Sequence, residues 1–331
     1  MVSYLKNRIG KLLRRRSAGR AGQRPEMIIV EPTNRCNLNC PFCLVGLQNQ
    51  LGTAEHDKIP RGFGFMDFGL YEKIVQDAVD FGIHRMQLHF QGEALLHKQF
   101  PDMVGLAKQY GMSTQVFTNG LALTEEYIDR IIQSGLDSMR FSVDGVSKET
   151  YEQNRVGGDY EKVFNNMKMM AEHARGSRTR VEWQFIVMRN NEHELQRAQE
   201  IARGIGIPFI AKTFAESVPD LMPADPKYRR NLKPKPCTDI CHSVAVFWNG
   251  DVVPCCYDLI GKETMGNIGE QTLTQIWNSE RYVNFRSRVD NAANDPDGEP
   301  ELCKTCLKWG HVQPLHPGQS ITTVNLETED V

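Results

Sequence analysis

The sequence lacks long hydrophobic runs. No stretch of its 331 residues approaches the roughly 18 consecutive apolar residues of a membrane-spanning helix, which excludes a protein built on such helices. The N-terminal segment is basic but has no apolar core, which excludes a secretory signal peptide. We therefore expect a cytoplasmic protein, in which nine cysteines are not expected to form a disulfide framework. Metal binding or catalysis is the better interpretation of so many thiols.

Acidic residues are missing from positions 1–24, which carry eight lysines and arginines. Because the net charge of the whole chain is −2, the remainder is acidic, which argues against nucleic-acid binding. Leu5, Ile9, Leu12 and Leu13 fit one face of a basic amphipathic helix. Such a helix can make peripheral contact with an anionic membrane surface, although docking on its own protein is the more common outcome.

Apolar and β-branched runs alternate with segments of helical period. The overall composition, 40% hydrophobic and 24% charged, is that of an ordinary globular protein. Strands are predicted at 27–31, 86–90, 114–118, 139–143, 181–187 and 208–213, and helices at 70–82, 124–135, 160–174 and 193–206. Six strand–helix units predict an α/β fold with a parallel sheet, either an open barrel or a doubly wound sheet. Spacing alone does not decide between the two.

Three cysteines, Cys36, Cys40 and Cys43, lie in the segment 34–66 after the first predicted strand. This segment has little regular pattern and is long for a strand-to-helix connection, as functional loops often are. A structural zinc site is commonly built from two separated ligand pairs, which a C-x3-C-x2-C triplet matches poorly. A [4Fe–4S] cluster held by three thiolates keeps one iron open for chemistry. An iron–sulfur cluster is therefore the better interpretation, with zinc as the alternative.

The triplet, with the aromatic Phe42 before its third cysteine, resembles the signature of the radical S-adenosylmethionine (SAM) superfamily. The resemblance implies a partial (β/α)6 TIM-like barrel whose catalytic [4Fe–4S] cluster is held by Cys36, Cys40 and Cys43. It also implies that SAM chelates the open iron and is cleaved by one electron. The resulting 5′-deoxyadenosyl radical would then abstract hydrogen from a substrate carbon. An electron donor such as flavodoxin or ferredoxin is implied as a partner.

Motifs at later strand ends extend the resemblance over about residues 25–215. The stretch "QGEALLH" is similar to the family's Gly-Gly-Glu motif, with Gln91 in place of the first glycine. There Gly92 would let the backbone approach SAM and Glu93 would accept from its ammonium group, although a tight turn with a solvated glutamate also fits. Arg155 stands where related enzymes often carry an arginine near the SAM carboxylate. The other residues that the resemblance places at the SAM site are Phe42, Thr118, Asn119, Ser142, Asp144 and Met188.

Five prolines between positions 219 and 236 mark a linker, and six cysteines follow it. Two short strands joined at Asn249–Gly250 predict a β-hairpin. From the residues alone, these cysteines fit zinc and iron–sulfur equally well. The order C-x12-G-x4-C, "GNI…IW" and C-x2-C resembles the SPASM domain, which implies an auxiliary [4Fe–4S] cluster. Its implied ligands are Cys237, Cys255, Cys303 and Cys306. Since no cysteine follows the last of these, we expect one auxiliary cluster.

Two cysteines, Cys241 and Cys256, are left without an assignment. Small buried residues are the simpler interpretation. Either one could replace a proposed auxiliary ligand, Cys256 most readily because it adjoins Cys255. Alternatively, one of them could donate a hydrogen atom to a substrate radical.

Together these features predict an oxygen-sensitive enzyme in three parts: a basic extension 1–24, a radical SAM core 25–215 and a SPASM-like domain 216–331 with an acidic tail. Three reactions stay open, namely dehydrogenation or epimerisation of a small molecule such as a sugar or aminocyclitol, and modification of a peptide. The short N-terminal region leaves no room for a leader-peptide recognition domain, which favours a small molecule. A zinc-binding interaction module is the non-enzyme alternative.

Overall fold

Nine strands form one sheet in the order β6-β5-β4-β3-β2-β1-β7-β8-β9. The computed structural model describes residues 24–51, 60–214, 218–229, 237–292, 294–304 and 306. The first six strands are β1 (Met27–Val30), β2 (Arg85–Leu88), β3 (Ser113–Thr118), β4 (Ser138–Ser142), β5 (Arg180–Val187) and β6 (Phe209–Thr213). The sequence predicts all six, and their ends differ from the prediction by at most two residues.

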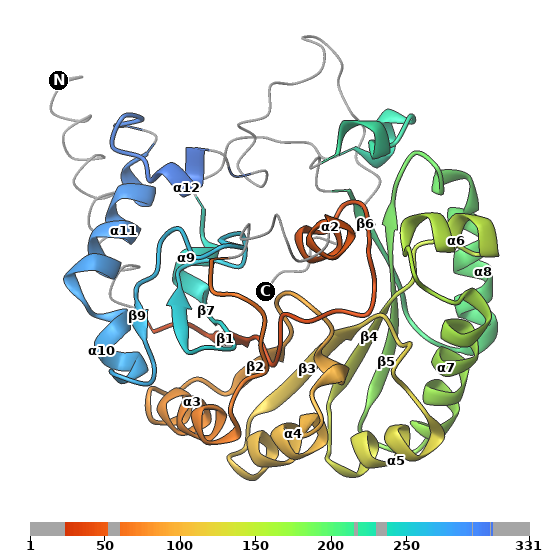
Figure 1. Ribbon diagram of the computed structural model, residues 1–331, viewed down its shortest axis with the longest axis horizontal. Helices are drawn as coiled ribbons and strands as arrows, with labels where there is room; N and C mark the ends of the chain where they lie inside the picture. Colours follow the sequence, from red (N-terminus) through yellow and green to blue (C-terminus); the bar gives the residue numbers. More distant parts are fainter. Residues whose placement is uncertain are drawn as a thin grey trace, which may run out of the picture.

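These six strands pair in chain order, and every pair is parallel. A doubly wound sheet changes its winding direction at a switch point, so the observed order excludes it and confirms the partial barrel. Figure 1 shows the strands along an open arc, with helices covering its convex side. The main outer helices are α3 (Phe68–Asp80), α4 (Phe100–Gln109), α5 (Glu125–Gln133), α7 (Tyr160–His173) and α8 (Leu195–Ile205).

Short polar side chains fix where three of these outer helices begin. The Thr124 hydroxyl accepts a hydrogen bond from the Tyr127 backbone N–H ahead of α5, as the sequence predicts. Asp67 and Asp159 cap α3 and α7 in the same way. Helix α8 ends at Gly206, whose φ of 84° lies in the left-handed region that favours glycine.

The two faces of the sheet differ in polarity. Residues such as Met86, Val116 and Phe141 belong to the apolar core shared with the outer helices. Since side chains alternate along a strand, the residues next to these in the same strands face the inside of the arc. There Arg140 and Glu182, both almost fully buried, form an ion pair of 2.8 Å. The inner face thus carries a buried ion pair beside apolar residues such as Met27 and Ile29.

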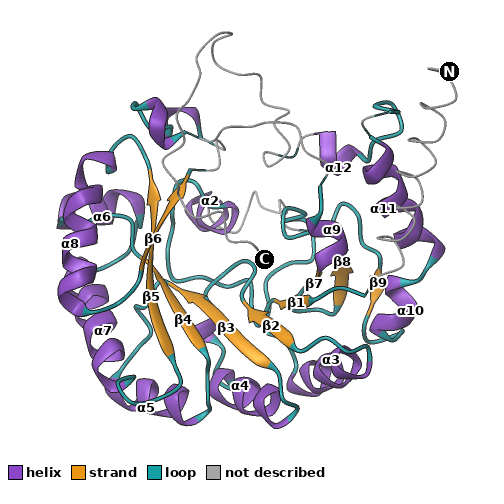
Figure 2. Ribbon diagram, turned by 180° about the vertical axis from the view of Figure 1, so that it is seen from behind, coloured by secondary structure: helices purple, strands orange, loops and turns teal. Residues whose placement is uncertain are grey.

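A helix stands where the sequence predicts little regular structure. Helix α2 (Leu44–Leu51) begins directly after Cys43, so the expectation of an irregular segment over 34–66 is wrong there. Figures 1 and 2 both place α2 inside the arc. A Cβ atom on Gly46 would lie 2.3 Å from the Cys40 carbonyl oxygen, so this glycine lets the helix pack directly against the cysteine loop.

The cysteine-rich C-terminal part continues the same sheet. The predicted hairpin is confirmed as β7 (Ser243–Val246) and β8 (Asp251–Val253), with Gly250 at φ 90° in the turn. Strand β7 pairs in parallel with β1, and Figure 2 shows the orange strands running on from β1 into this region. The other elements here are α9 (Asp239–His242), β9 (Gly266–Asn267), α10 (Leu273–Trp277), α11 (Glu280–Asn291) and α12 (Glu301–Lys304).

Shorter elements complete the described part of the chain: α6 (Lys148–Asn154), η1 (Ala94–Leu96), η2 (Glu192–Glu194), η3 (Pro219–Leu221) and η4 (Pro226–Tyr228). None of the helices within the described ranges is both long enough and apolar enough to cross a bilayer. The predicted amphipathic helix of residues 5–13 and the acidic C-terminal tail lie outside the described residues.

Candidate active site

The three clustered cysteines follow β1, at the C-terminal edge of the barrel strands. The Asn49 side-chain amide holds their loop by donating to the carbonyl oxygens of Cys36 (3.2 Å) and Leu38 (3.0 Å). Burial raises the pKa of the Cys36 thiol to about 12 and also raises the pKa of Cys40. The neighbouring thiols, including Cys43, contribute to both shifts, so the three sulfur atoms lie near one another.

The three thiols have the donor chemistry of an iron–sulfur cluster, whose irons are usually bound by cysteine thiolates. Three thiolates leave one iron of a [4Fe–4S] cluster open. Cys36, Cys40 and Cys43 therefore fit such a cluster, and their role as its ligands stays a prediction.

Glu93 lies at the centre of a hydrogen-bond network beside this loop. Its Oε1 accepts from the Thr118 hydroxyl (2.8 Å) and the Leu95 N–H (3.1 Å), and its Oε2 accepts from the Asn119 N–H (2.7 Å). Burial raises the pKa of Glu93, although these three donors oppose the shift. A carboxylate has about four acceptor positions, so one position on Oε2 is left for a further donor such as an ammonium group.

Gly92 joins the Glu93 motif to the cysteine loop. Its φ is 75°, and an added Cβ would lie 2.6 Å from the Arg35 carbonyl oxygen and 2.7 Å from that of Thr33. The Glu93 N–H also donates to the Arg35 carbonyl oxygen (2.8 Å). The structure thus requires glycine for contact with the cysteine loop; the predicted approach of this backbone to SAM is a separate matter and stays a prediction.

Arg155 is held by Asp144 and reaches a cysteine. Its Nε and Nη2 atoms lie 2.7 and 2.5 Å from Asp144 Oδ2, and its Nη1 lies 3.8 Å from Cys40 Sγ. The guanidinium carbon is 5.3 Å from the centre of the Phe42 ring. Asp144 is fully buried and its Oδ1 accepts from the Ile186 N–H. The structure therefore brings three predicted SAM-site residues, Phe42, Asp144 and Arg155, together at the cysteine loop.

The remaining predicted SAM-site residues surround the same strand ends. The Asn119 side-chain amide lies 4.0 Å from Cys36 Sγ and donates to Asn37 Oδ1. Ser142 ends β4 opposite Gln184 and is half-buried. Met188 follows β5, is fully buried and packs with Phe214 and Met222 in a small cluster that Phe42 joins. Polar groups and a small apolar cluster thus both lie beside the cysteine loop.

Five C-terminal cysteines interact electrostatically with one another. Burial raises the pKa of Cys303 to about 12, with contributions from Cys237 and Cys306. A hydrogen bond with Cys256, together with burial, raises the pKa of Cys255, and Cys237 adds to this shift. Cys237 is therefore near both Cys255 and Cys303, an arrangement that fits the predicted auxiliary cluster. No disulfide joins any of the nine cysteines, all of which lie in the described part of the chain.

The two unassigned cysteines lie on opposite faces of the sheet. Cys241 belongs to the main core and lies near Tyr282 and Arg286 of α11. Cys256 instead packs against the small cluster of Met27, Ile29, Ala245, Phe247 and Val253 on the inner face. Only the second position is on the side where a substrate would lie in the barrel.

Sequence reasoning missed a buried ion pair that links the two cysteine regions. Arg61 binds Glu31 through Nη2 (2.9 Å) and Nε (3.3 Å), and its guanidinium lies 3.6 Å from the centre of the Phe247 ring. Arg61 Nη1 and the Gln91 side chain both donate to the carbonyl oxygen of Leu259, which follows the hairpin. The one available signal was Gln91 itself, a long polar residue in place of the family's glycine.

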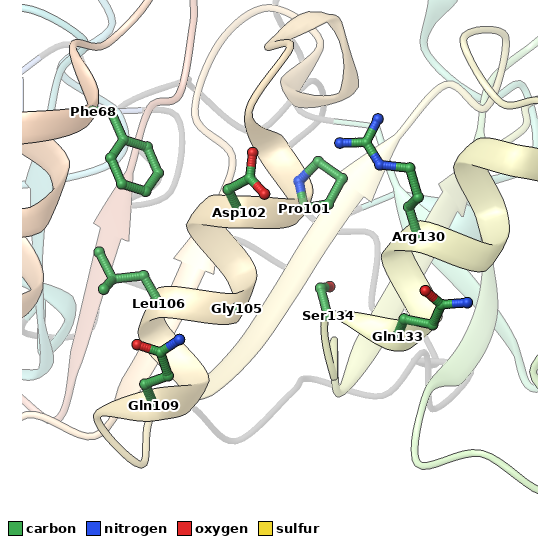
Figure 3. A pocket seen from close by; sticks show the side chains of 9 residues that line it. All are labelled: Phe68, Pro101, Asp102, Gly105, Leu106, Gln109, Arg130, Gln133 and Ser134. Atoms are coloured by element: carbon green, nitrogen blue, oxygen red, sulfur yellow. The ribbon is translucent and has the colours of Figure 1, made fainter.

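The structure also has a surface cleft of about 520 Å³, shown in Figure 3. Figure 3 shows Arg130 and Gln133 of α5 on one side of α4 and Phe68 on the other. These helices cover the convex side of the sheet, whereas the cysteine loop and Glu93 lie at the strand ends. The cleft is therefore a groove of the outer helix layer and does not contain any predicted site residue.

Comparison with known proteins gives matches over both halves of the chain. The model of the radical SAM superfamily matches residues 30–200, and that of the SPASM iron–sulfur cluster-binding domain matches residues 237–307. The chain is 25% identical to the S-adenosyl-L-methionine-dependent 2-deoxy-scyllo-inosamine dehydrogenase of Niallia circulans, over 85% of this chain and 92% of that protein. It is 24% identical to the PqqA peptide cyclase of Xanthomonas axonopodis, over 86% and 82%.

A solved structure with a similar fold is Streptococcus suis SuiB bound to S-adenosylmethionine. The TM-score is 0.64 at 14% sequence identity, and the match covers 87% of this chain and 72% of that one. At this identity the likeness concerns the fold alone, and it agrees with the open barrel described above.

Proposed function

Because this chain belongs to the radical SAM superfamily, we propose that it dehydrogenates or epimerises a small polyhydroxylated molecule, such as a sugar or aminocyclitol, after hydrogen abstraction from carbon. The two matched domains imply a catalytic [4Fe–4S] cluster, an auxiliary [4Fe–4S] cluster and SAM. When bound, the catalytic cluster and SAM supply a 5′-deoxyadenosyl radical, and the auxiliary cluster supplies an electron acceptor.

The residues of this chain would hold these groups as follows. Cys36, Cys40 and Cys43 would bind the catalytic cluster, and the free acceptor position of Glu93 would take the SAM ammonium group. Met188 and Phe42 would provide an apolar wall for the rest of SAM. The ligands of the auxiliary cluster would be Cys237, Cys255, Cys303 and Cys306.

The observation that carries the proposal is the similarity to the S-adenosyl-L-methionine-dependent 2-deoxy-scyllo-inosamine dehydrogenase, which covers 85% of this chain and 92% of that protein. Dehydrogenation removes two hydrogens from an alcohol, one as the abstracted atom and one as a proton, while the remaining electron passes to an acceptor.

Peptide modification is the second candidate, favoured by the similarity to the PqqA peptide cyclase. We further propose that the reductant is a protein of flavodoxin or ferredoxin type and that the enzyme works in the cytoplasm. The zinc alternative is separated cheaply by anaerobic purification, since iron–sulfur protein is brown and zinc protein is colourless.

The experiment that tests the proposal is a product-mass assay. The reconstituted protein, SAM and a chemical reductant are incubated anaerobically in deuterated water with sugars, aminocyclitols and candidate peptides. A dehydrogenated product loses two hydrogens, and an epimerised one gains one deuteron. A cross-linked peptide with no change in any small molecule would overturn the proposal in favour of peptide modification.

A further inference from the structure

A buried cation lies against one sulfur of the three-cysteine loop. The Arg155 side chain is 12% exposed, and its Nη1 atom is 3.8 Å from Cys40 Sγ. Arg155 carries five N–H donors in a rigid plane, and three of its nitrogen atoms point at Asp144 and Cys40. The guanidinium therefore contacts its acid partner and the thiol at the same time.

Asp144 holds the guanidinium in this position. Both Nε and Nη2 bind its Oδ2, while its Oδ1 accepts from the Ile186 backbone N–H at 2.6 Å. The Asp144 carbonyl oxygen accepts from the side chains of Asn154 and Asn191. Because Asp144 is fixed by β5 and by two amides, Arg155 cannot turn away from Cys40 without losing a buried ion pair.

We propose that Arg155 sets the reduction potential of the catalytic cluster and that Asp144 is the positioning residue that aims it. The inference rests on the cluster of the proposed function. One electron passes from a low-potential one-electron donor to the cluster, no bond changes, and the cluster with its thiolates becomes one charge more negative. A cation in contact with a ligating sulfur stabilises that more negative state, strongly so in a buried site.

This role differs from the arginine's predicted contact with the SAM carboxylate. Its contact is with the thiol of Cys40 and not with SAM, so its effect on the cluster should not require bound SAM. Asn119 offers a comparison, because its neutral amide lies 4.0 Å from Cys36 Sγ. A neutral donor polarises the sulfur less than a full charge does, so Arg155 is expected to have the larger influence.

The test is an anaerobic redox titration of the reconstituted full-length protein, followed by electron paramagnetic resonance without SAM or substrate. The catalytic signal is identified as the one that changes when SAM is added to a parallel sample. Two variants are compared with the parent protein. The double variant combines Arg155→Gln with Asp144→Asn, which removes both charges and leaves no unpaired buried carboxylate. The single variant is Arg155→Lys. The auxiliary cluster is the internal control, because its cysteines belong to a different part of the sheet.

At a given potential, the ratio of reduced to oxidised catalytic cluster should be at least tenfold lower in the double variant than in the parent. This corresponds to a reduction potential about 59 mV more negative for one electron. The Arg155→Lys variant should shift in the same direction by less, because a compact ammonium that pairs with Asp144 cannot also contact Cys40. The auxiliary potential should not change in either variant.

An unchanged catalytic potential in the double variant would overturn the inference. Equal shifts of both clusters would do so as well, since they would report a general change in the protein. If the double variant does not hold its catalytic cluster, the Arg155→Lys variant provides the test. A catalytic potential in that variant equal to the potential in the parent protein would reject the inference. A parent protein with eight irons but no SAM-responsive signal would instead refute the proposed function, and this inference with it.

Discussion

Replacing Glu93 by glutamine should separate SAM binding from protein stability. The Glu93 carboxylate accepts three internal hydrogen bonds and has one acceptor position left. A glutamine that keeps its oxygen toward Thr118 and Leu95 turns its amide nitrogen toward the Asn119 N–H. One buried donor then lacks an acceptor, which should lower the free energy of unfolding by about 1–3 kcal/mol.

The effect on SAM comes from the lost charge. A charge-assisted hydrogen bond contributes about 1.5–3 kcal/mol, so the dissociation constant of SAM should rise by about 10- to 150-fold. Anaerobic calorimetry of the reconstituted protein measures this constant, and urea unfolding measures stability. An unchanged dissociation constant would place Glu93 outside the SAM site.

Thr179→Val is the matched control for this prediction. The Thr179 hydroxyl donates to the Leu136 carbonyl oxygen (2.7 Å), and neither residue belongs to the predicted SAM site, so valine leaves one buried acceptor without its donor and leaves Glu93 unchanged. It should reduce stability about as much as Glu93→Gln while changing SAM affinity by less than about threefold. A similar loss of affinity in both variants would mean that the glutamine acts through the structure rather than through its charge.

Three further predictions concern the hairpin and the auxiliary cysteines. Changing Cys303 and Cys306 to alanine should remove about four irons and abolish the normal product but leave 5′-deoxyadenosine formation. Chromatography measures both products, on protein that has been shown to be folded. A full yield of the normal product would contradict this prediction. If the enzyme epimerises, Cys256→Ala should abolish deuterium incorporation into the product from deuterated water, while Cys241→Ala on the opposite face should not. Normal deuterium incorporation in both variants would mean that the two cysteines are packing residues. Arg61→Met should lower the free energy of unfolding by about 3–5 kcal/mol because it leaves Glu31 buried and unpaired. Arg197→Met in the exposed pair with Glu200 should cost less than about 1 kcal/mol, and equal losses in the urea assay would refute the importance of burial.

The strands and outer helices of the barrel could be predicted because their signals are local, whereas the choice of a barrel over a doubly wound sheet came from the family resemblance. Each strand is a short apolar run and each outer helix has its own apolar face, so periodicity alone locates them. The three-cysteine triplet is equally local, and the strand ends that carry Glu93 and Asp144 follow from the element order. These residues meet in space because parallel strands end at the same edge.

Other features depend on contacts between distant segments, which no local pattern reveals. The pairing of β7 with β1 joins residues more than 200 positions apart, and Arg61, the partner of Glu31, lies in a segment without regular period. Helix α2 escaped prediction because it is short and contains Gly46, whose role is close packing on Cys40 rather than helix formation. The inner position of Cys256 and the outer position of Cys241 required the structure as well, since their separation depends on how the hairpin joins the sheet.

The central claim is that Cys36, Cys40 and Cys43 hold the cluster at which SAM is cleaved, and one measurement tests it directly. The parent protein and a variant with all three cysteines changed to alanine are reconstituted anaerobically, assayed for iron, and incubated with SAM and a strong reductant. The parent should bind about eight irons and release 5′-deoxyadenosine, while the variant should bind about four and release none. Formation of 5′-deoxyadenosine by the variant, or its absence from a parent protein with a full complement of iron, would contradict the claim.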